Sequence, residues 1–298
     1  MTVTGALPEQ ESPRIVVGVD DGPAALAALR WAVAEAGRRQ ADLRVLRGVR
    51  AGRGEAEVDL AAATEDLEAL LDKECRLELS AERVSGQVIT NDVGHELVTA
   101  ASGARLLVLG STVRHETVAA LVGSVARHAT EHASCPVVLV RPEASLSGDG
   151  RIVVGLDTSL GGAEALKWAV AEGARTGSPV TAVYAYEPGG SGGADARVAA
   201  EDELEMSVRS VIGHRELPVS VDARAVPGDP GEVLAELALG ADLMVVGHRR
   251  RGAVARALLG SVARHCARTA TCPVVVVPTP AASLVERLVP REQLAEPY

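Results

Sequence analysis

The residues of this chain that could bind a ligand occur twice, at a constant spacing of 137 residues. Each copy has an aspartate after one apolar run, a glycine after another, and a Gly-Ser pair 13 residues beyond that glycine. Glycine lets the backbone approach a phosphate, a helix N-terminus offers free N–H groups, and a carboxylate can accept a hydrogen bond from a nucleoside. These positions are Asp20, Gly110 and Gly123-Ser124 in the first copy, and Asp157, Gly247 and Gly260-Ser261 in the second.

The elements that must position these residues alternate between short apolar runs and longer Ala-, Glu- and Arg-rich segments, which predicts parallel strands joined by helices. Ligands of such sheets bind beyond the carboxyl ends of the strands, where the three features of each copy converge. The expected strands are 14–20, 43–49, 83–89, 106–109, 136–140, 152–157, 180–186, 219–226, 243–247 and 273–277. The expected helices are 23–39, 57–79, 92–102, 123–132, 163–175, 195–212, 230–239 and 260–269.

The repeat divides the 298 residues into two domains of ordinary size. We expect an N-terminal tail (1–12), a first domain (13–143), a linker (144–150), a second domain (151–279) and a C-terminal extension (280–298). The chain has no Phe, so its core must consist of Val, Leu, Ile and Ala.

The composition argues against several classes of protein. A net charge of −10 disfavours a general nucleic-acid binder. No apolar run approaches the roughly 20 residues of a membrane span, and the polar N-terminus carries no signal peptide. The four cysteines are spaced too widely for a zinc motif, which favours buried thiols in a reducing cytoplasm.

The chain resembles the universal stress protein family in its tandem form, over about residues 14–141 and 151–278. The resemblance rests on VVGVD and VVGLD, on a tryptophan in each first helix, and on the CPVV run that ends each copy. It rests further on LLVLG with LVGSVARHA, and on LMVVG with LLGSVARHC. It implies a Rossmann-like α/β fold of two open five-stranded parallel sheets, each of order 3-2-1-4-5 with helices on both faces. It also implies pairing of the domains through their fifth strands.

The resemblance further implies ATP binding, through the family pattern Gly-x2-Gly-x9-Gly-Ser/Thr. The chain keeps the outer spacing, but the middle glycine is Val113 in one copy and Arg250 in the other. If that position needs a left-handed backbone, a residue with a side chain costs about 1–2 kcal/mol, which weakens ATP binding. The second copy offers arginines that could neutralise phosphates, whereas the first has Glu116. We therefore expect the second copy to be the better site.

The expected cofactor is ATP, with or without Mg²⁺, and no catalytic or metal-binding residue is assigned. The expected partners are an adenine nucleotide and an unknown protein, but neither nucleic acid nor membrane, in an intramolecular pseudo-dimer for which further pairing into a homodimer stays open. The residues expected at the site of the second copy are Asp157, Thr158, Ser159, Val183, Gly247, Arg249, Arg250, Gly252, Gly260, Ser261 and Val262. Those of the first copy are Asp20, Leu46, Gly110, Gly123, Ser124 and Val125.

Plainer roles stay open at these positions. The aspartates could only cap helices, the glycines could only end strands, the Gly-Ser pairs could only begin helices, and the arginine run 249–251 could be a solvated loop or a protein contact. The leading interpretation is a cytoplasmic regulator controlled by ATP occupancy. One alternative is a degenerate member that binds no nucleotide and acts as a protein scaffold. Another is a hydrolase or nucleotidyl-transfer enzyme, although no catalytic group repeats across the copies.

Two formal motifs are set aside because neither recurs in the other copy. His128 to His132 matches HxxEH, but the corresponding segment lacks the glutamate and the second histidine. Residues 189–193 match GxSxG without the strand and helix that a nucleophile elbow requires. We expect the paired tryptophans, Trp31 and Trp168, to lie in the core.

Overall fold

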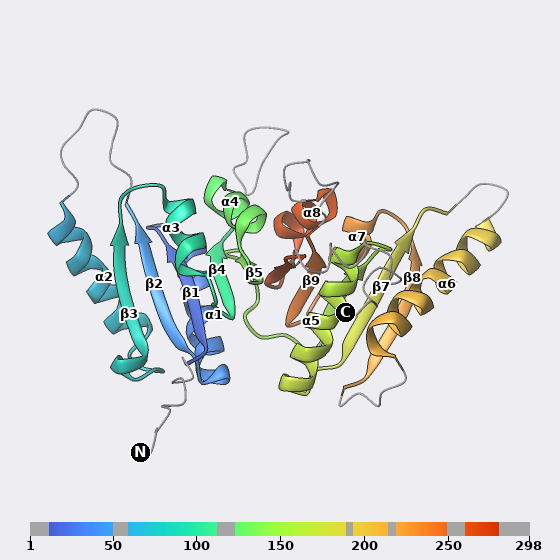
Figure 1. Ribbon diagram of the computed structural model, residues 1–298, viewed down its shortest axis with the longest axis horizontal. Coiled ribbons are helices and arrows are strands. Elements are labelled where there is room, and N and C mark those ends of the chain that lie inside the picture. Colours follow the sequence, from blue (N-terminus) through green and yellow to red (C-terminus); the bar gives the residue numbers. More distant parts are fainter. Residues whose placement is uncertain are drawn as a thin grey trace, which may run out of the picture.

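Figure 1 shows the computed structural model, which describes residues 12–49, 59–111, 123–188, 193–213, 219–248 and 260–279. These residues form a ten-stranded sheet of order β3-β2-β1-β4-β5-β10-β9-β6-β7-β8. Each half of the sheet has five parallel strands in the expected order 3-2-1-4-5, so the predicted fold class is confirmed.

The strands of the first half are β1 (Arg14–Val19), β2 (Asp42–Gly48), β3 (Val84–Ile89), β4 (Leu106–Gly110) and β5 (Val137–Val140). Its helices are α1 (Pro23–Arg39), α2 (Leu60–Glu74), α3 (Val93–Ala100) and α4 (Ser124–His132), with a short 3₁₀ helix at Ala81–Arg83.

The strands of the second half are β6 (Ile152–Leu156), β7 (Val180–Tyr186), β8 (Val221–Pro227), β9 (Leu243–Gly247) and β10 (Val274–Val277). Its helices are α5 (Leu160–Thr176), α6 (Gly193–Ile212), α7 (Pro230–Leu237) and α8 (Ser261–Thr269).

Local capping explains where the helices depart from the sequence-based expectations. The second helix was expected over 57–79, but its described part begins after Asp59, whose carboxylate accepts the N–H groups of residues 61 and 62. The fifth helix was expected from residue 163 but begins at Leu160, because the Ser159 hydroxyl accepts the N–H of Gly162. It ends at Gly177, which takes a left-handed φ of 76°.

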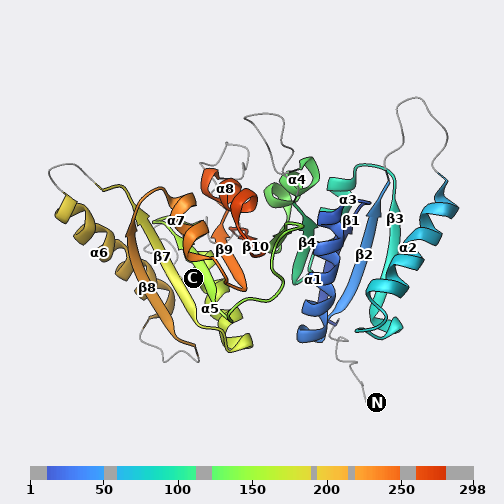
Figure 2. The ribbon, with the colours of Figure 1, turned by 180° about the vertical axis from the view of Figure 1, so that it is seen from behind.

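Helices cover both faces of the sheet, as Figures 1 and 2 show from opposite sides. Alternate strand residues face opposite ways, so Ile15 and Val17 join the core under α1 and α2, while Val16 joins the core under α3 and α4. The second half repeats this arrangement with α5 and α6 on one face and α7 and α8 on the other. The core consists mainly of Val, Leu, Ile and Ala, as the lack of Phe requires.

The two halves join through the fifth strand of each copy. Strands β5 and β10 pair antiparallel, with Val138 opposite Val275, and both valines are fully buried. The strand pairing that the family resemblance implies is therefore observed within one chain. Among the described residues, none of the helices has the length and apolar character needed to cross a membrane.

Candidate functional site

The first-copy aspartate lies where β1 ends and α1 is about to begin. The Asp20 carboxylate is exposed and accepts the N–H of Gly22 at 2.9 Å, which holds the turn into the helix. The next residue, Asp21, forms an ion pair with Arg47 of β2 (2.7 Å). The additional acid of the first copy is thus balanced by a cation on the neighbouring strand.

The second-copy aspartate is more enclosed than its counterpart. Asp157 is half-buried and accepts the N–H of Ser159 at 3.0 Å, and it also accepts the Ser159 hydroxyl. Ser159 in turn caps α5. The helix cap is therefore the serine, and Asp157 holds that serine in place. Thr158, which replaces Asp21 at this repeat position, is exposed and carries no charge.

A tyrosine that sequence reasoning missed lies beside Asp157. Tyr184 of β7 is in register with Leu156, the last residue of β6. Burial raises the pKa of the Tyr184 hydroxyl above its ordinary value, and the negative charges of Glu203 and Asp157 raise it further. The equivalent residue of the first copy is Arg47, 137 positions earlier. Comparing the two copies for unlike residues would have drawn attention to this position.

The strand-ending glycines have a packing role that a simple turn does not explain. A Cβ at Gly110 would lie 2.6 Å from the Ala24 carbonyl carbon and 2.7 Å from the Ala25 nitrogen, in the first turn of α1. A Cβ at Gly247 would collide with the backbone of Gly161 in α5. Glycine is therefore required because a helix crosses the strand end in direct backbone contact.

The Gly-Ser pairs begin α4 and α8, as expected. Gly123 and Gly260 are the N-caps, and neither helix has a side-chain cap hydrogen bond among the described residues. Helices α2, α3, α5 and α7 all have one, from an aspartate or a serine. Helix α1 lacks one too, but it begins with Pro23, which has no N–H. Within the part of the chain that the structure describes, no side chain occupies the first N–H groups of α4 and α8, the groups that bind anions at helix N-termini.

Gly123 differs from the strand-ending glycines in its surroundings. A Cβ built on Gly123 would meet none of the described atoms within 4 Å. Its φ of −49° is also accessible to any residue. The described part of the fold therefore does not require glycine here, and the small residue leaves open space at the helix N-terminus.

Apolar site candidates lie behind this edge. Leu46 of β2 and Val183 of β7 are 2% and 1% exposed and belong to the core under α3, α4, α7 and α8. Val125 and Val262, in the first turns of α4 and α8, are half-buried against the same core. Ser124 and Ser261 are exposed.

Some expected positions lie outside the described residues. These are Val113, Arg249, Arg250 and Gly252, together with the loops that contain them. The effect of the altered middle glycine and the role of the arginine run therefore stay predictions.

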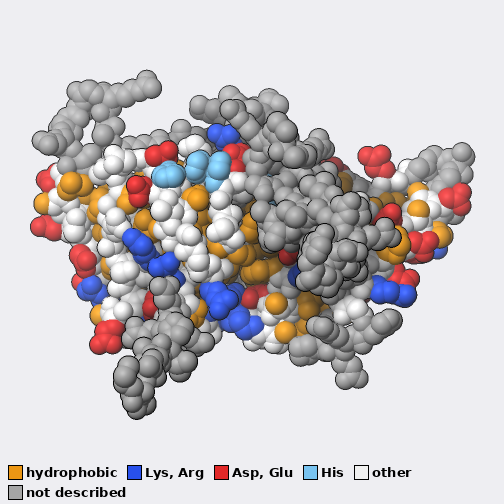
Figure 3. Space-filling view, in the orientation of Figure 1, with side chains coloured by type: hydrophobic (Ala, Val, Ile, Leu, Met, Phe, Trp, Pro, Cys, Tyr) orange, Lys and Arg blue, Asp and Glu red, His pale blue; other side chains and the backbone are white. Residues whose placement is uncertain are grey.

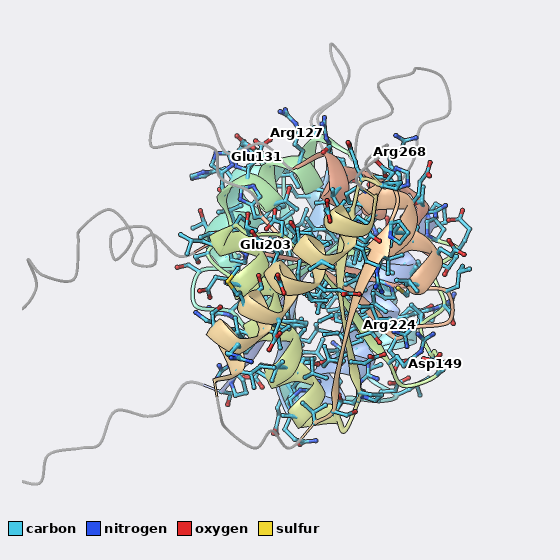
Figure 4. The ribbon with its side chains drawn as sticks, turned by 90° about the vertical axis from the view of Figure 1, so that its right-hand side faces the viewer. Arg127, Glu131, Asp149, Glu203, Arg224 and Arg268 are labelled. Carbon is cyan, nitrogen blue, oxygen red and sulfur yellow. The ribbon has the colours of Figure 1, made fainter. Side chains whose placement is uncertain are left out.

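Figures 1 and 2 show α4 and α8 side by side at the edge formed by the carboxyl ends of the strands. In Figure 4, Arg127 of α4 and Arg268 of α8 lie at this edge, and Asp149 of the linker lies toward the opposite one. Ser111, directly after β4, donates its hydroxyl to the Ala267 carbonyl of α8 at 3.3 Å. The carboxyl edge of the first half is therefore in direct contact with the last turn of α8 in the second half.

The sequence profile of the universal stress proteins matches the chain twice, over residues 12–141 and 150–278. The chain belongs to the universal stress protein family. A universal stress protein of Mycolicibacterium smegmatis is 28% identical over 285 residues, covering 88% of this chain and 96% of that protein. One from Mycobacterium tuberculosis H37Rv is also 28% identical, covering 88% and 95%. The tandem organisation is thus shared with full-length relatives.

Solved structures show the same universal stress protein fold. A universal stress protein of Archaeoglobus fulgidus superimposes with a TM-score of 0.66 at 21% identity, covering 91% of this chain and all of that one. A second structure, from Pseudomonas aeruginosa, gives a TM-score of 0.59 at 17% identity, with 90% and 93% covered. At these identities the similarity concerns the fold.

The HxxEH segment of this universal stress protein lies on α4 and has a packing role. The rings of His128 and His132 stack with centroids 4.2 Å apart, and histidine side chains gather over α3 and α4 in Figure 3. A Cβ at Gly94 of α3 would lie 3.1 Å from the His128 ring. Gly231 and His265 repeat this contact in the second half. Among the described residues, no group of three His, Cys, Asp or Glu side chains could hold a metal.

The junction contains a buried charge cluster that sequence reasoning missed. Glu35 of α1 and Glu172 of α5 are 3% and 5% exposed. Arg39 bonds to both carboxylates, at 2.5 and 2.7 Å, and so does Arg175, at 2.7 and 2.5 Å. The glutamates stand 137 residues apart, as do Arg38 and Arg175, so the repeat itself carried the signal.

Proposed function

We propose that this universal stress protein binds ATP at the carboxyl edge of each half and acts as a stress-response regulator through ligand occupancy. The observation that carries the proposal is the pair of helix N-termini, α4 and α8, that begin with Gly-Ser and have no side-chain cap among the described residues. Each free N-terminus presents N–H groups and the positive end of the helix dipole to a phosphate.

The neighbouring residues suit the rest of a nucleotide. Strands β1 and β4 are adjacent and parallel, with Gly18 paired with Leu109. Asp20, which follows β1, therefore lies at the same carboxyl edge as Gly110, the last residue of β4. A carboxylate there can accept a hydrogen bond from a ribose hydroxyl. Leu46 and Val183 are buried in the core behind the edge and hold it in place.

We further propose that the second half binds ATP more tightly. Its edge has the uncharged Thr158 where the first half has Asp21, and a negative charge near polyphosphate weakens binding. Tyr184 adds an aromatic ring beside Asp157, where the first half has an arginine already paired with Asp21. The arginines at 249–251 would add positive charge at the same edge.

The test uses the full chain and two matched variants, Gly260→Val and Gly123→Val, which place a branched side chain at the N-cap of one helix each. Both caps have extended backbone angles that valine can adopt (φ −58°, ψ 158° and φ −49°, ψ 153°), so neither substitution strains the backbone. In isothermal titration with ATP, Gly260→Val should weaken the affinity of the tighter site by about tenfold or more. Gly123→Val should leave the affinity of that site unchanged.

Equal loss in both variants would remove the proposed asymmetry. Unchanged titrations in both would remove the site. A second candidate function, a scaffold that binds proteins without nucleotide, is favoured by the replacement of the middle glycine in both copies. Mass spectrometry of small molecules released from the freshly purified protein separates the two, because only the ATP-binding protein should release an adenine nucleotide.

A further inference from the structure

A cavity of about 830 Å³ lies where the two halves meet, at the amino ends of the strands. Its wall includes residues directly before or at the start of β1, β2, β4 and β5, and residues on α1 and α5. The lining residues that matter here are Arg14, Arg39, Asp42, Arg105, Trp168 and Arg175. This edge is opposite to the carboxyl edge of the proposed ATP sites, so the cavity is a separate feature.

Two of the arginines stand side by side on neighbouring strands. The register of β1 with β4 pairs Ile15 with Leu106, and the residues directly before this pair are Arg14 and Arg105. The Arg105 N–H donates to the Arg14 carbonyl at 2.8 Å. Adjacent strands are about 4.8 Å apart and paired residues face the same side, so two positively charged side chains begin next to each other at the end of the sheet. Their repulsion favours a negative group between them.

Neither of these arginines has an acidic partner among the described residues. The Arg14 guanidinium donates through Nη2 to the Ser102 carbonyl at 3.2 Å, and its buried Nε has no hydrogen-bond partner there. Arg105 is exposed, and none of the ion pairs of the described residues includes it. Asp42, the neighbour of Arg14 on β2, lies 3.8 Å from Arg83.

The other charges of the wall are balanced within the protein. Arg39 and Arg175 share the carboxylates of Glu35 and Glu172 in the junction cluster described above. The excess positive charge of the cavity therefore belongs to Arg14 and Arg105. In a chain with a net charge of −10, this local excess is the reverse of the overall charge.

The corresponding place in the second half is filled by the linker. Asp242 occupies the repeat position of Arg105 and accepts the Gly148 N–H at 2.5 Å. Asp149 bonds to Arg151, the equivalent of Arg14, at 2.7 Å. The repeat thus has an acid and a peptide segment in the second half where the first half has two arginines and a cavity.

We propose that this cavity binds a multiply charged anion, carrying phosphate or carboxylate groups, between Arg14 and Arg105. Guanidinium groups make strong charge-assisted hydrogen bonds to both classes of anion. The volume admits a molecule larger than a single phosphate, and Trp168 in the wall offers it an aromatic surface. Occupancy would bridge the two halves, because Arg14 belongs to the first and Trp168 to the second.

The test titrates the full-length protein with pyrophosphate and, separately, with citrate, by calorimetry and by tryptophan fluorescence. We expect binding that weakens with ionic strength and changes the emission of Trp168, because Trp31 is 3% exposed and lies away from the cavity. Whichever of the two anions binds more tightly shows whether the cavity prefers phosphate or carboxylate groups. Arg14→Gln and Arg105→Gln should each weaken binding about tenfold, and Trp168→Phe should remove the fluorescence change.

The matched control is Arg151→Gln, which changes the equivalent arginine of the second half and should leave anion binding intact. Arg14→Lys with Arg105→Lys keeps both charges and should retain most of the affinity, which separates charge from loss of fold. ATP affinity should be unchanged in Arg14→Gln, so a failure of this proposal is distinct from a failure of the ATP sites. The proposal is overturned if neither anion binds or if Arg14→Gln combined with Arg105→Gln binds as tightly as the unaltered protein. It is also overturned if binding appears only after residues 2–11 are removed.

Discussion

At the scale of single residues, two kinds of glycine share the edge of the proposed ATP site. Gly110 and Gly247 let a helix backbone touch a strand end, and a side chain at either position would collide with main-chain atoms. Gly123 meets open space among the described residues. Glycines that belong to the same sequence pattern are thus required for different physical reasons, and substitutions can distinguish these reasons.

Gly110→Ala should destabilise the fold by about 3 kcal/mol, because the added methyl group would lie 2.6 Å from backbone that cannot rotate away. Gly123→Ala, the matched control, should cost no more than about 1 kcal/mol, the typical effect of a changed N-cap. Urea unfolding measures both. Equal losses would show that the contact between β4 and α1 relaxes freely.

The buried thiols give a pH dependence with a defined sign. Burial raises the pKa of Cys135 to about 11 and that of Cys272 to about 12, from an ordinary value of 9.0. The unfolded chain loses these protons first, so their stabilisation is complete below pH 9 and is lost as the pH rises toward the folded pKa values. Between pH 7.5 and 10.5, Cys272→Ala should lose about 2 kcal/mol less stability than the unaltered protein. If urea unfolding shows the same loss of stability in Cys272→Ala and in the unaltered protein, the pH dependence does not come from the Cys272 thiol.

At the scale of elements, the helices differ in whether a side chain caps their N-terminus. Four helices begin at an aspartate or serine whose side chain accepts N–H groups of the first helical turn, so these ends need no ligand. Helix α1 also begins at a glycine without such a cap, but its first helical residue is Pro23, which has no N–H to offer. Helices α4 and α8 begin at glycine without such a cap among the described residues and keep the N–H of their first residue. Their N-termini are less stable than a capped end and more receptive to an anion.

Gly260→Asp should reverse that balance in α8. The new carboxylate can accept the first N–H groups and interact with the helix dipole, which should raise stability by about 0.5 kcal/mol. The same carboxylate would repel phosphate, so ATP binding by the second half should fall at least about tenfold. Thermal unfolding and ATP titration test the two halves of this prediction. Gly260→Ala is the control: it should lower stability slightly and reduce ATP affinity less than the aspartate does.

At the scale of the whole molecule, the repeat produces a continuous sheet and a charged seam. Strands β5 and β10 join the two halves by antiparallel backbone pairing. The cluster of two glutamates with Arg39 and Arg175 joins α1 to α5. Figure 1 shows α1 and α5 on either side of the junction. The halves are therefore coupled by backbone pairing as well as by ion pairs with little exposure.

Glu35→Ala should weaken this coupling, because Arg39 and Arg175 would each lose the carboxylate of a side chain that is only 4% exposed. Removing one partner of a buried ion pair costs about 3 kcal/mol. Arg38→Gln is the control, since its side chain is 51% exposed and its pair with Glu35 should contribute less than about 1 kcal/mol. Calorimetric unfolding should show a lower transition for Glu35→Ala, and similar transitions for both variants would contradict a role for the cluster.

The sequence by itself determined the repeat, the α/β class and the order of elements, because a constant offset and alternating apolar runs are local properties of the chain. It also located Asp20, Gly110 and Gly123 at one edge, since parallel strands bring their carboxyl ends together. The expectation that both tryptophans lie in the core was right for Trp31 and holds in part for Trp168, which packs against the core but is only partly buried and also lines the junction cavity.

Only the tertiary structure decided how equivalent residues came to differ. Arg105 and Asp242 share a repeat position, but the linker covers one and leaves the other beside a cavity. Glu35 and Glu172 read as ordinary surface residues on helices until α1 and α5 are brought together. Such contacts join residues more than 90 positions apart, and the burial that gives them their energy exists only once both halves are folded and joined.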